Sequence, residues 1–210
     1  MYESLSPAAT RDMLLAVAKS VVDQTEMLTQ VDQAIGDGDH GIGMRRGFSA
    51  VLTQLHDADP TDVEAVVKAA GTAIMVKTGG AAGAVFGTFF RAGSAGFAGR
   101  EAFDAEGLAT FLAIGLEAVE KRGGSRPGQK TMIDALAPAA MAAKAAISLG
   151  LPEALRRAAA AAVAGVEATK GMIATTGKAR TLGERSLGHP DPGAVSFSLV
   201  VLAMRDFVVA

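Results

Sequence analysis

The sequence predicts an all-α fold of eight helices in a single domain that covers residues 1–210. Half of the residues are hydrophobic. Alanine, the strongest helix former, is abundant, whereas β-branched residues rarely cluster. Apolar residues such as Leu14, Val17 and Val21 recur at helical spacing, and no strand pattern or internal repeat is found. A chain of 210 residues is long enough to bury one core.

Capping residues and prolines mark the expected helix boundaries. Ser6 followed by Pro7 predicts the start of the first helix, which should continue to about Val31. Thr61 with Glu64 three residues later forms a capping box before the third helix. The second to eighth helices are expected within residues 41–55, 63–78, 84–96, 105–122, 131–150, 152–176 and 192–209.

The later helices carry their own start and stop signals. Asp104 is a suitable cap for the fifth helix, and the glycines at 123 and 124 should end it. Pro138 predicts a kink in the sixth helix. Asp191 followed by Pro192 repeats, at the start of the last helix, the pattern of a capping residue before proline.

The loops fall into two classes that alternate along the chain. Those after the first, third, fifth and seventh helices are glycine-rich and polar: "GDGDHGIG", "TGGAAG", "RGGSRPGQKT" and "TTGKARTLGERSLGHPDPG". The others, such as "HDADPTD" and "SLGLP", lack this character. Alternate loops of an up-and-down bundle lie at the same end. All four glycine-rich loops are therefore expected at one rim.

Composition excludes several classes of protein. The net charge of −2 and the single tyrosine, with no tryptophan, argue against nucleic-acid binding. The absence of cysteine excludes disulfides, thiolate metal sites and thiol nucleophiles. The N-terminus lacks a signal-peptide pattern, and apolar runs such as "FSLVVLAM" fall short of the ~20 residues that span a bilayer. We therefore expect a cytoplasmic protein with no membrane or nucleic-acid partner.

Three aspartates, Asp32, Asp37 and Asp39, lie within eight residues of one another in the first glycine-rich segment. Like charges about 5 Å apart repel by roughly 3 kcal/mol per pair at an effective dielectric constant of 20, so their convergence calls for a cation or a proton. Carboxylate ligands without cysteine suit a hard cation such as Mg²⁺, which also holds phosphate oxygens. A solvated acidic turn is the alternative, because aspartate and glycine are common in turns.

Glycines stand where two of the expected helices begin. Gly41 and Gly43 open one, and Gly79, Gly80 and Gly83 precede or open another. A helix N-terminus offers free N–H groups and a partial positive charge, and glycine lets an anion approach the backbone. Isolated glycines of this kind more often simply end or begin helices. Two such ends beside three aspartates favour phosphates bridged by metal.

The last glycine-rich loop adds four basic side chains to the expected rim: Lys178, Arg180, Arg185 and His189. Their cations would neutralise phosphate charge. The alternative is a pair of surface salt bridges with Glu184 and Asp191.

Two further residues are candidates for a role at the rim. His40 beside Asp39 is a candidate for contacting phosphate or orienting an aspartate, although phosphoryl transfer does not require a base. Met132 is placed to pack on a flat ring, but methionine in a helix is usually a core residue. The sequence contains no Walker A, dinucleotide-binding or protein-kinase motif.

Four segments in order resemble the nucleotide-binding L subunit of dihydroxyacetone kinases, the DhaL-type domain of the DAK2 family. They are "IGDGDHGIGMRRGF", "GGAAGAVFGTFF", "PGQKTMIDAL" and "LGERSLGHPDPGA", and the resemblance covers nearly the whole chain. It implies a barrel of eight antiparallel helices with the nucleotide site at one rim.

The resemblance also implies roles for individual residues. Asp32, Asp37 and Asp39 would hold two Mg²⁺ ions that bridge the phosphates of ADP or ATP, and with His40 they form the expected catalytic set. The implied nucleotide-binding residues are His40, Gly41, Ile42 and Gly43 at the phosphates, Ala81 and Ala82 at the next helix start, Gly123 and Met132 beside the adenine, Lys178, and Asp191, Pro192 and Gly193.

Two positions depart from the family pattern. Relatives commonly have serine where this chain has Ala82, and arginine where it has Lys178. The chain thus lacks one hydroxyl contact to phosphate and the bidentate fork of arginine. We expect altered nucleotide affinity rather than loss of binding.

By resemblance, the chain is a phosphoryl-transfer subunit of a kinase for dihydroxyacetone or a related triose or tetrose, in glycerol metabolism. A separate K subunit would hold the sugar. The chain length favours tightly bound ADP that is recharged by a phosphotransferase-system phosphocarrier, although exchange with free ATP stays open. The resemblance also leaves open whether the protein is a homodimer and whether the substrate is a tetrulose such as erythrulose. Two alternative functions stay open as well: a nucleotide-dependent regulatory module and a metal-dependent phosphohydrolase.

Overall fold

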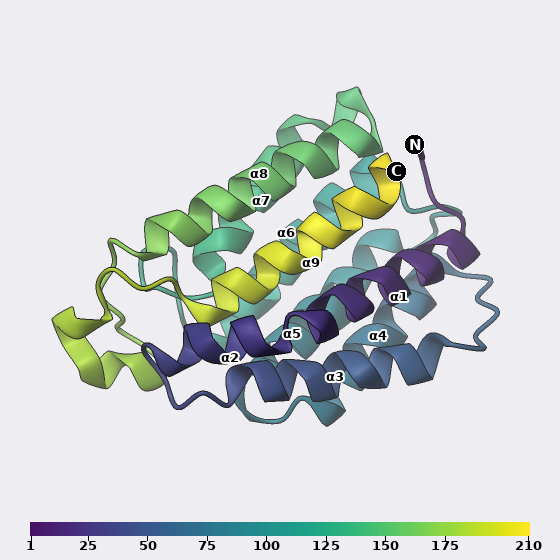
Figure 1. Ribbon diagram of the computed structural model, residues 1–210. Coiled ribbons are helices and arrows are strands. Elements are labelled where there is room, and N and C mark those ends of the chain that lie inside the picture. The colour runs from purple at the N-terminus through teal and green to yellow at the C-terminus, as the bar shows by residue number, and fades with distance from the viewer.

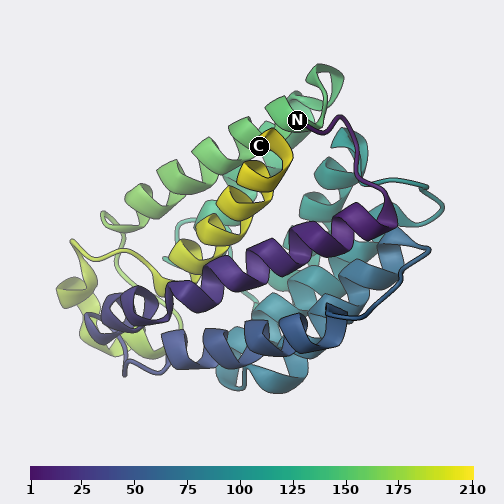
Figure 2. The same cartoon turned by 45° about the vertical axis from the view of Figure 1, so that its right-hand side comes forward.

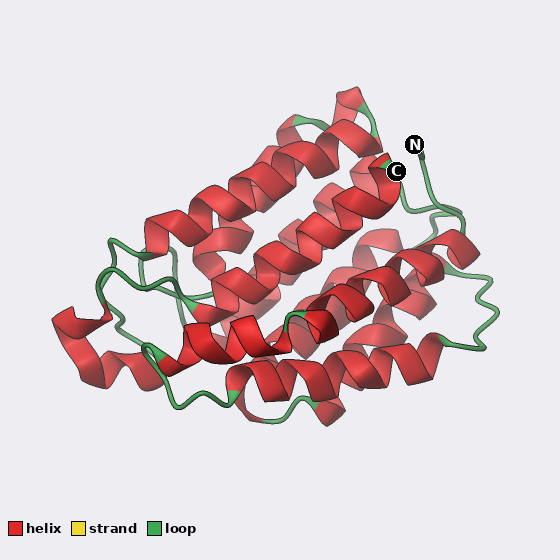
Figure 3. Cartoon of the chain, viewed as in Figure 1, coloured by secondary structure: helices red, strands yellow, loops and turns green.

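The computed structural model describes residues 1–210 and consists of helices joined by loops (Figure 3). The α-helices are α1 (Pro7–Asp23), α2 (Thr25–Gln33), α3 (His40–Leu55), α4 (Val63–Lys77), α5 (Gly80–Gly93), α6 (Ala105–Gly123), α7 (Ile133–Ala145), α8 (Leu151–Thr169) and α9 (Pro192–Val209). Short 3-10 segments cover Ser94–Phe97, Ile147–Leu149 and Lys178–Ser186. The all-α prediction is confirmed.

The long helices form a closed ring. Each of α3 to α8 packs against the next helix in the chain, and α1 closes the ring by packing against both α3 and α9. The short helix α2 extends α1 at one end of this barrel, where it contacts α3 and α9 (Figure 1). The chain termini lie at the opposite end (Figure 2). The ring is the antiparallel arrangement implied by the family resemblance.

The first expected helix is divided in two. At Gln24 the backbone leaves the helical region, with φ −96° and ψ 13°, and the hydroxyl of Thr25 donates to the carbonyl of Val22 at 2.6 Å. This local bond competes with the regular helix ladder. Residues 25–33 therefore run as the separate helix α2, which ends beside the start of α3.

Other helix boundaries differ from the expectations by a few residues. The cap of α4 is Asp62 rather than Thr61, because the Asp62 carboxylate accepts from the N–H of Ala65 at 2.6 Å. Helix α8 stops at Thr169 instead of residue 176. Asp104 and Asp191 cap α6 and α9 as predicted, each accepting at 2.7 Å from the N–H three residues later.

A single apolar core of 48 buried residues fills the barrel. Within this core, Phe89 makes edge-to-face contacts with Phe90, Phe111 and Phe197. Small residues let the helices approach: a Cβ on Gly115 would lie 2.5 Å from the Phe89 ring. The abundance of alanine and glycine therefore serves close helix packing as well as helix formation.

Helix α9 alone is long and apolar enough to cross a membrane by length and composition, with 18 residues of mean hydropathy 1.6. Half of that window is buried inside the protein. The helix packs against α1 and α8, and Phe197, Val201 and Met204 belong to the core cluster. Its hydropathy is thus explained by its place in the barrel wall.

Candidate functional site

A cleft of about 430 Å³ opens at the rim of the barrel that carries α2. Residues from all four glycine-rich loops line it, which confirms that these loops share one end of the molecule. The predicted site residues in its lining are Asp32, Asp39, His40, Gly43, Ala81, Ala82, Gly123, Met132, Lys178, Asp191, Pro192 and Gly193. Asp37, Gly41 and Ile42 lie outside the lining.

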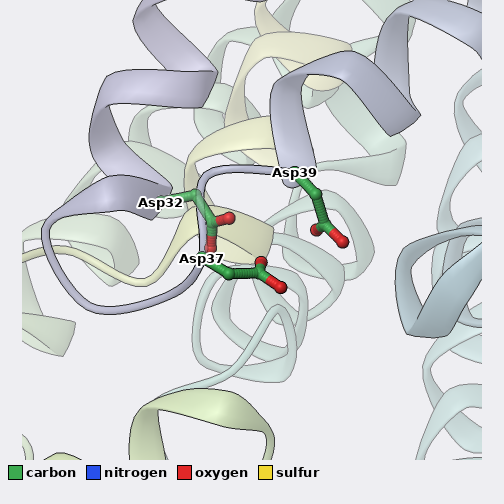
Figure 4. A group of neighbouring side chains, drawn as sticks. All are labelled: Asp32, Asp37 and Asp39. Atoms are coloured by element: carbon green, nitrogen blue, oxygen red, sulfur yellow. The ribbon is translucent and has the colours of Figure 1, made fainter.

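The three aspartates converge at the mouth of the cleft (Figure 4). Asp32 comes from the last turn of α2 and is buried, Asp37 lies in the following loop, and Asp39 directly precedes α3. One oxygen from each carboxylate lies within 4.8 Å of the other two. This set of hard oxygen donors fits a divalent cation such as Mg²⁺, and the exposed Asp37 and Asp39 leave room for phosphate oxygens and water as further ligands.

Lys178 supplies positive charge to this cluster. Its ammonium group bonds to the carboxylate of Asp37 and lies 3.0 Å from that of Asp39. The hydrogen bond from Lys178 lowers the pKa of Asp37, and the bonds to both aspartates raise the pKa of Lys178. The cluster therefore holds one cationic group, the Lys178 ammonium, in the folded protein.

The other basic side chains of the last glycine-rich loop are placed differently. Arg180, Arg185 and His189 do not line the cleft, so only Lys178 of the four reaches it. The alternative of salt bridges with Glu184 and Asp191 is wrong, because neither carboxylate forms an ion pair. Arg180 and Arg185 belong to the 3-10 segment from Lys178 to Ser186, and His189 follows it; all three lie outside the lining of the cleft.

His40 is held between the acidic cluster and α9. Its Nε2 lies 2.7 Å from the hydroxyl of the fully buried Ser196, and its backbone N–H donates to the Asp32 carboxylate at 3.2 Å. Burial lowers the pKa of His40, against the opposing charges of Asp32 and Asp39. At neutral pH the imidazole is therefore neutral, and it can form one hydrogen bond to a ligand while Ser196 orients it.

Two helix N-termini border the cleft. At the start of α5, Gly79 and Gly80 have φ values of +77° and +57°, and a Cβ on Gly80 would meet no atom within 4 Å. The requirement for glycine at 80 is therefore conformational. The turn directs the N-terminus of α5, with Ala81 and Ala82, toward the cleft. This arrangement suits an anionic ligand.

Of the three residues at the start of α3 that were expected to contact phosphate, only one lines the cleft. Gly43 lines the cleft. Gly41 instead packs against α2, since a Cβ there would lie 2.3 Å from the carbonyl oxygen of Thr25. The Ile42 side chain is 43% exposed, outside the lining. Contacts of Gly41 and Ile42 with phosphate stay predictions.

The opposite wall is formed by Gly123, Met132 and the start of α9. Met132 is buried, and a Cβ on Gly193 would lie 3.4 Å from its Cβ. Burial raises the pKa of Asp191 to about 7, although the N–H of Ala194 stabilises its charged form. This largely apolar wall, with a partly buried carboxyl, contrasts with the exposed carboxylates at the mouth of the cleft.

The structure adds lining residues to which the sequence reasoning gave no role. Arg46 donates to the carbonyl of Thr78 at 2.9 Å between the two helix N-termini, and the buried Lys130 lies on the opposite wall. Both stand inside segments that carry the family resemblance. Their position within those motifs was the one sequence signal that could have marked them as site residues. A spacing pattern does not show which way a side chain points.

The sequence matches the DAK2 domain family over residues 34–206. It is 42% identical over 190 residues to the ADP-binding subunit DhaL of the PEP-dependent dihydroxyacetone kinase 1 of Listeria innocua, covering 90% of this chain and 91% of that protein. It is 37% identical to the corresponding Escherichia coli subunit, covering 86% and 88% of the two chains.

The fold is similar to that of a solved kinase. The dihydroxyacetone kinase of C. freundii in complex with AMP-PNP and Mg²⁺ superposes with a TM-score of 0.75 at 26% identity, over 98% of this chain and 35% of that one. The resemblance to DhaL-type subunits is thereby confirmed, and the chain belongs to the DAK2 domain family.

Proposed function

We propose that this protein is the nucleotide-carrying subunit of a ketose kinase. It would pass the γ-phosphoryl group of a Mg²⁺-bound nucleotide to dihydroxyacetone, or a related triose or tetrose, held on a separate K subunit. The observation that carries the proposal is the meeting of three aspartates and two helix N-termini at one cleft. The names of the full-length relatives, ADP-binding subunits of dihydroxyacetone kinases, support it.

Residues at the mouth of the cleft would bind the metal and the phosphates, and residues of its wall would bind the adenine. Asp32, Asp37 and Asp39 would hold Mg²⁺, two ions in the family pattern, which neutralise phosphate charge and align the transferred group. Lys178 would turn from the aspartates toward the phosphates once divalent ions occupy the cluster. His40, fixed by Ser196, would donate a hydrogen bond to a phosphate oxygen.

The adenine would lie against the apolar wall. Met132 and Gly123 line this wall, and methionine packs well on flat rings. Pro192 and Gly193 at the start of α9 would close the site beside the base. The C. freundii kinase crystallised with AMP-PNP and Mg²⁺ shares the fold, which supports both the nucleotide and the metal as cofactors.

For the phosphoryl donor we propose a phosphocarrier fed from phosphoenolpyruvate, with ADP retained between turnovers in the cytoplasm. The relatives that match over nearly their full length are named PEP-dependent or PTS-dependent. A partly apolar cleft of about 430 Å³ is suited to retaining a nucleotide.

The first experiment measures nucleotide retention. The protein is loaded with Mg²⁺ and ADP, desalted, and its bound nucleotide is quantified by chromatography after denaturation. Asp37→Asn and Asp39→Asn should each reduce retention at least tenfold, because each removes a charged ligand. The matched control is Asp57→Asn, an exposed aspartate at the opposite end of the barrel.

Reconstitution then tests transfer. The protein is mixed with a sugar-binding K subunit and offered either ATP or phosphoenolpyruvate with carrier proteins. Turnover that depends on the carriers is expected, and turnover with excess ATP alone would overturn the retained-cofactor proposal. Full ADP retention by both aspartate variants would overturn the metal bridge, and phosphatase activity of the isolated chain would point to a hydrolase. Nucleotide binding without any sugar phosphorylation would point to a regulatory module.

A tetrulose is the second candidate for the substrate. The L-erythrulose 1-kinase of Mycolicibacterium smegmatis is 34% identical over 186 residues, and the chain spans 33% of that protein. The reconstitution should therefore compare dihydroxyacetone with erythrulose on each K subunit. A preference that changes with the K subunit would place substrate selection on the partner.

A further inference from the structure

Lys130 is a buried lysine on the wall of the cleft for which the proposed chemistry has no role. Its side chain is only 3% exposed, and burial lowers its pKa against the charges of Asp191 and Asp134. Its own backbone has φ +59°, the only positive value outside glycine. Burying an ammonium group costs free energy unless hydrogen-bond acceptors compensate the lost hydration. The acceptors of Lys130 therefore indicate what its side chain does.

The ammonium group of Lys130 joins the two stems of one long loop. It donates to the carbonyl of Thr169, the last residue of α8, at 2.6 Å, and to that of His189 at 2.5 Å. Residues 170–190 between these stems form the loop that carries Lys178, here named the Lys178 loop, and connect α8 to α9 at the rim (Figure 1). One side chain from the α6–α7 connection therefore closes the base of this loop.

Neighbouring bonds fix the same junction. The Asp134 carboxylate accepts from the N–H groups of Gly128 at 2.5 Å and Thr131 at 2.7 Å, and so holds the turn that presents Lys130. The Thr169 hydroxyl accepts from the N–H of Asp191 at 3.0 Å. The α8 end is thereby tied to the residue that caps α9.

Close packing brings these elements together. A Cβ on Gly165 of α8 would lie 2.3 Å from the carbonyl oxygen of Asp134, so α8 touches the first turn of α7 there. The N–H of Gly188 also donates to the carbonyl of Lys170 at 2.8 Å, which brings the two stems of the Lys178 loop together a second time.

We infer that Lys130 is a positioning residue of the nucleotide site: it clamps both stems of the Lys178 loop and so holds Lys178 and the start of α9 against a bound nucleotide. This inference rests on the proposed nucleotide-binding function. Removing the clamp frees the stems, so the loop opens more often and ADP leaves faster. Helices that do not pack against this junction, such as α4 and α5, keep their protection, because the barrel core does not depend on it.

The test compares Lys130→Met with Lys170→Met. Methionine keeps the length and flexibility of the side chain and removes the donors. Lys170 is the matched control, because it stands at the same stem but is solvent-exposed and pairs only with Glu167. Two quantities are measured on each full-length variant: the release rate of a fluorescent ADP analogue in Mg²⁺, and hydrogen exchange of the nucleotide-free protein by segment.

In Lys130→Met we expect roughly tenfold faster release, the fold-change of a lost hydrogen bond from a charged donor. Exchange should rise in residues 170–195 and stay unchanged in α4 and α5. A purely structural role would instead raise exchange throughout the barrel. Wild-type release and protection in Lys130→Met, or faster exchange everywhere, would overturn the inference.

Thr169→Val covers the case in which Lys130→Met does not fold. It removes the hydroxyl that accepts from Asp191 and keeps the backbone carbonyl, so we expect the same changes at smaller size. Unchanged release and exchange in this variant would also overturn the clamp. If the wild-type protein fails to bind ADP, the proposed function is wrong, whereas hydrogen exchange still decides whether Lys130 holds the loop.

Discussion

The two ends of the barrel are built on different principles. At the cleft end lie the three charged side chains that the fold buries: Asp32, Lys130 and Asp134. At the opposite end backbone pairing and apolar packing predominate. Leu5 and Phe103 exchange two backbone hydrogen bonds, at 2.9 and 2.8 Å, and Tyr2 stacks on Phe207 with ring centroids 5.6 Å apart.

This difference separates the end of the barrel that binds the ligand from the end that mainly stabilises the fold. Buried charges lower stability unless partners compensate them, so a protein concentrates them where a ligand requires them. Here backbone groups compensate the buried charges: Lys130 donates to two carbonyls, and Asp134 accepts from two N–H groups. The opposite end carries no such requirement and serves to close the barrel. The predictions below test this division, beginning with the largest effect.

Asp191→Asn should remove the pH dependence that a partly buried carboxyl gives to the cleft end. The pKa of Asp191 is raised from 3.8 to about 7 in the folded protein. Its stabilising contribution is therefore complete below pH 4 and is lost as the pH rises to 7. Relative to the variant, the wild type should lose up to about 1.4 kcal/mol of unfolding free energy per pH unit across that window.

Urea denaturation of both proteins between pH 4 and 8, without nucleotide, measures this difference. Asparagine caps helices about as well as aspartate, so the helix start is preserved. Parallel stability profiles in the two proteins would contradict the prediction.

A pair of glycine substitutions separates conformational strain from function. Gly80 at the cleft end and Gly99 at the opposite end have φ values of +57° and +73°, and neither has an atom within 4 Å of a built Cβ. Alanine at either position should cost about 1 kcal/mol of unfolding free energy, because only the backbone conformation is strained. Denaturant titration checks these values.

The two glycine variants should differ in nucleotide binding. Gly80→Ala should weaken Mg²⁺-ADP binding, measured by calorimetry, because it disturbs the N-terminus of α5 at the cleft. Gly99→Ala should bind as the wild type does. Equal effects of both substitutions on binding would remove the distinction between the two ends.

The smallest effect is expected from restoring the family pattern in the cleft. Ala82→Ser adds a hydroxyl at the start of α5, and Lys178→Arg adds a bidentate donor. Each should tighten ADP binding roughly two- to tenfold, the range of one added hydrogen bond. Calorimetry of the single and double variants measures this gain, and weaker binding in both single variants would show that the cleft is adapted to alanine and lysine.

Much of the fold was predictable because its signals are local. Asp104 and Asp191 cap helices through bonds to the third following residue, and such patterns are visible in any sequence. The break at Gln24 and the cap at Asp62 were missed, because competing local hydrogen bonds decided them among several suitable residues. The alternation of the two loop classes was sufficient to predict a common rim, because alternate loops of an up-and-down bundle lie at the same end.

Local sequence patterns therefore predict the all-α class, most helix starts and the acidic triplet near a helix N-terminus. Which side chains enter the cleft depends instead on the packing of distant segments. Lys178 reaches Asp39 across 139 residues, and Lys130 reaches His189 across 59. Such contacts depend on how the ring of helices closes and which way each helix face turns. No pattern within one segment encodes these quantities, because packing between distant segments sets them.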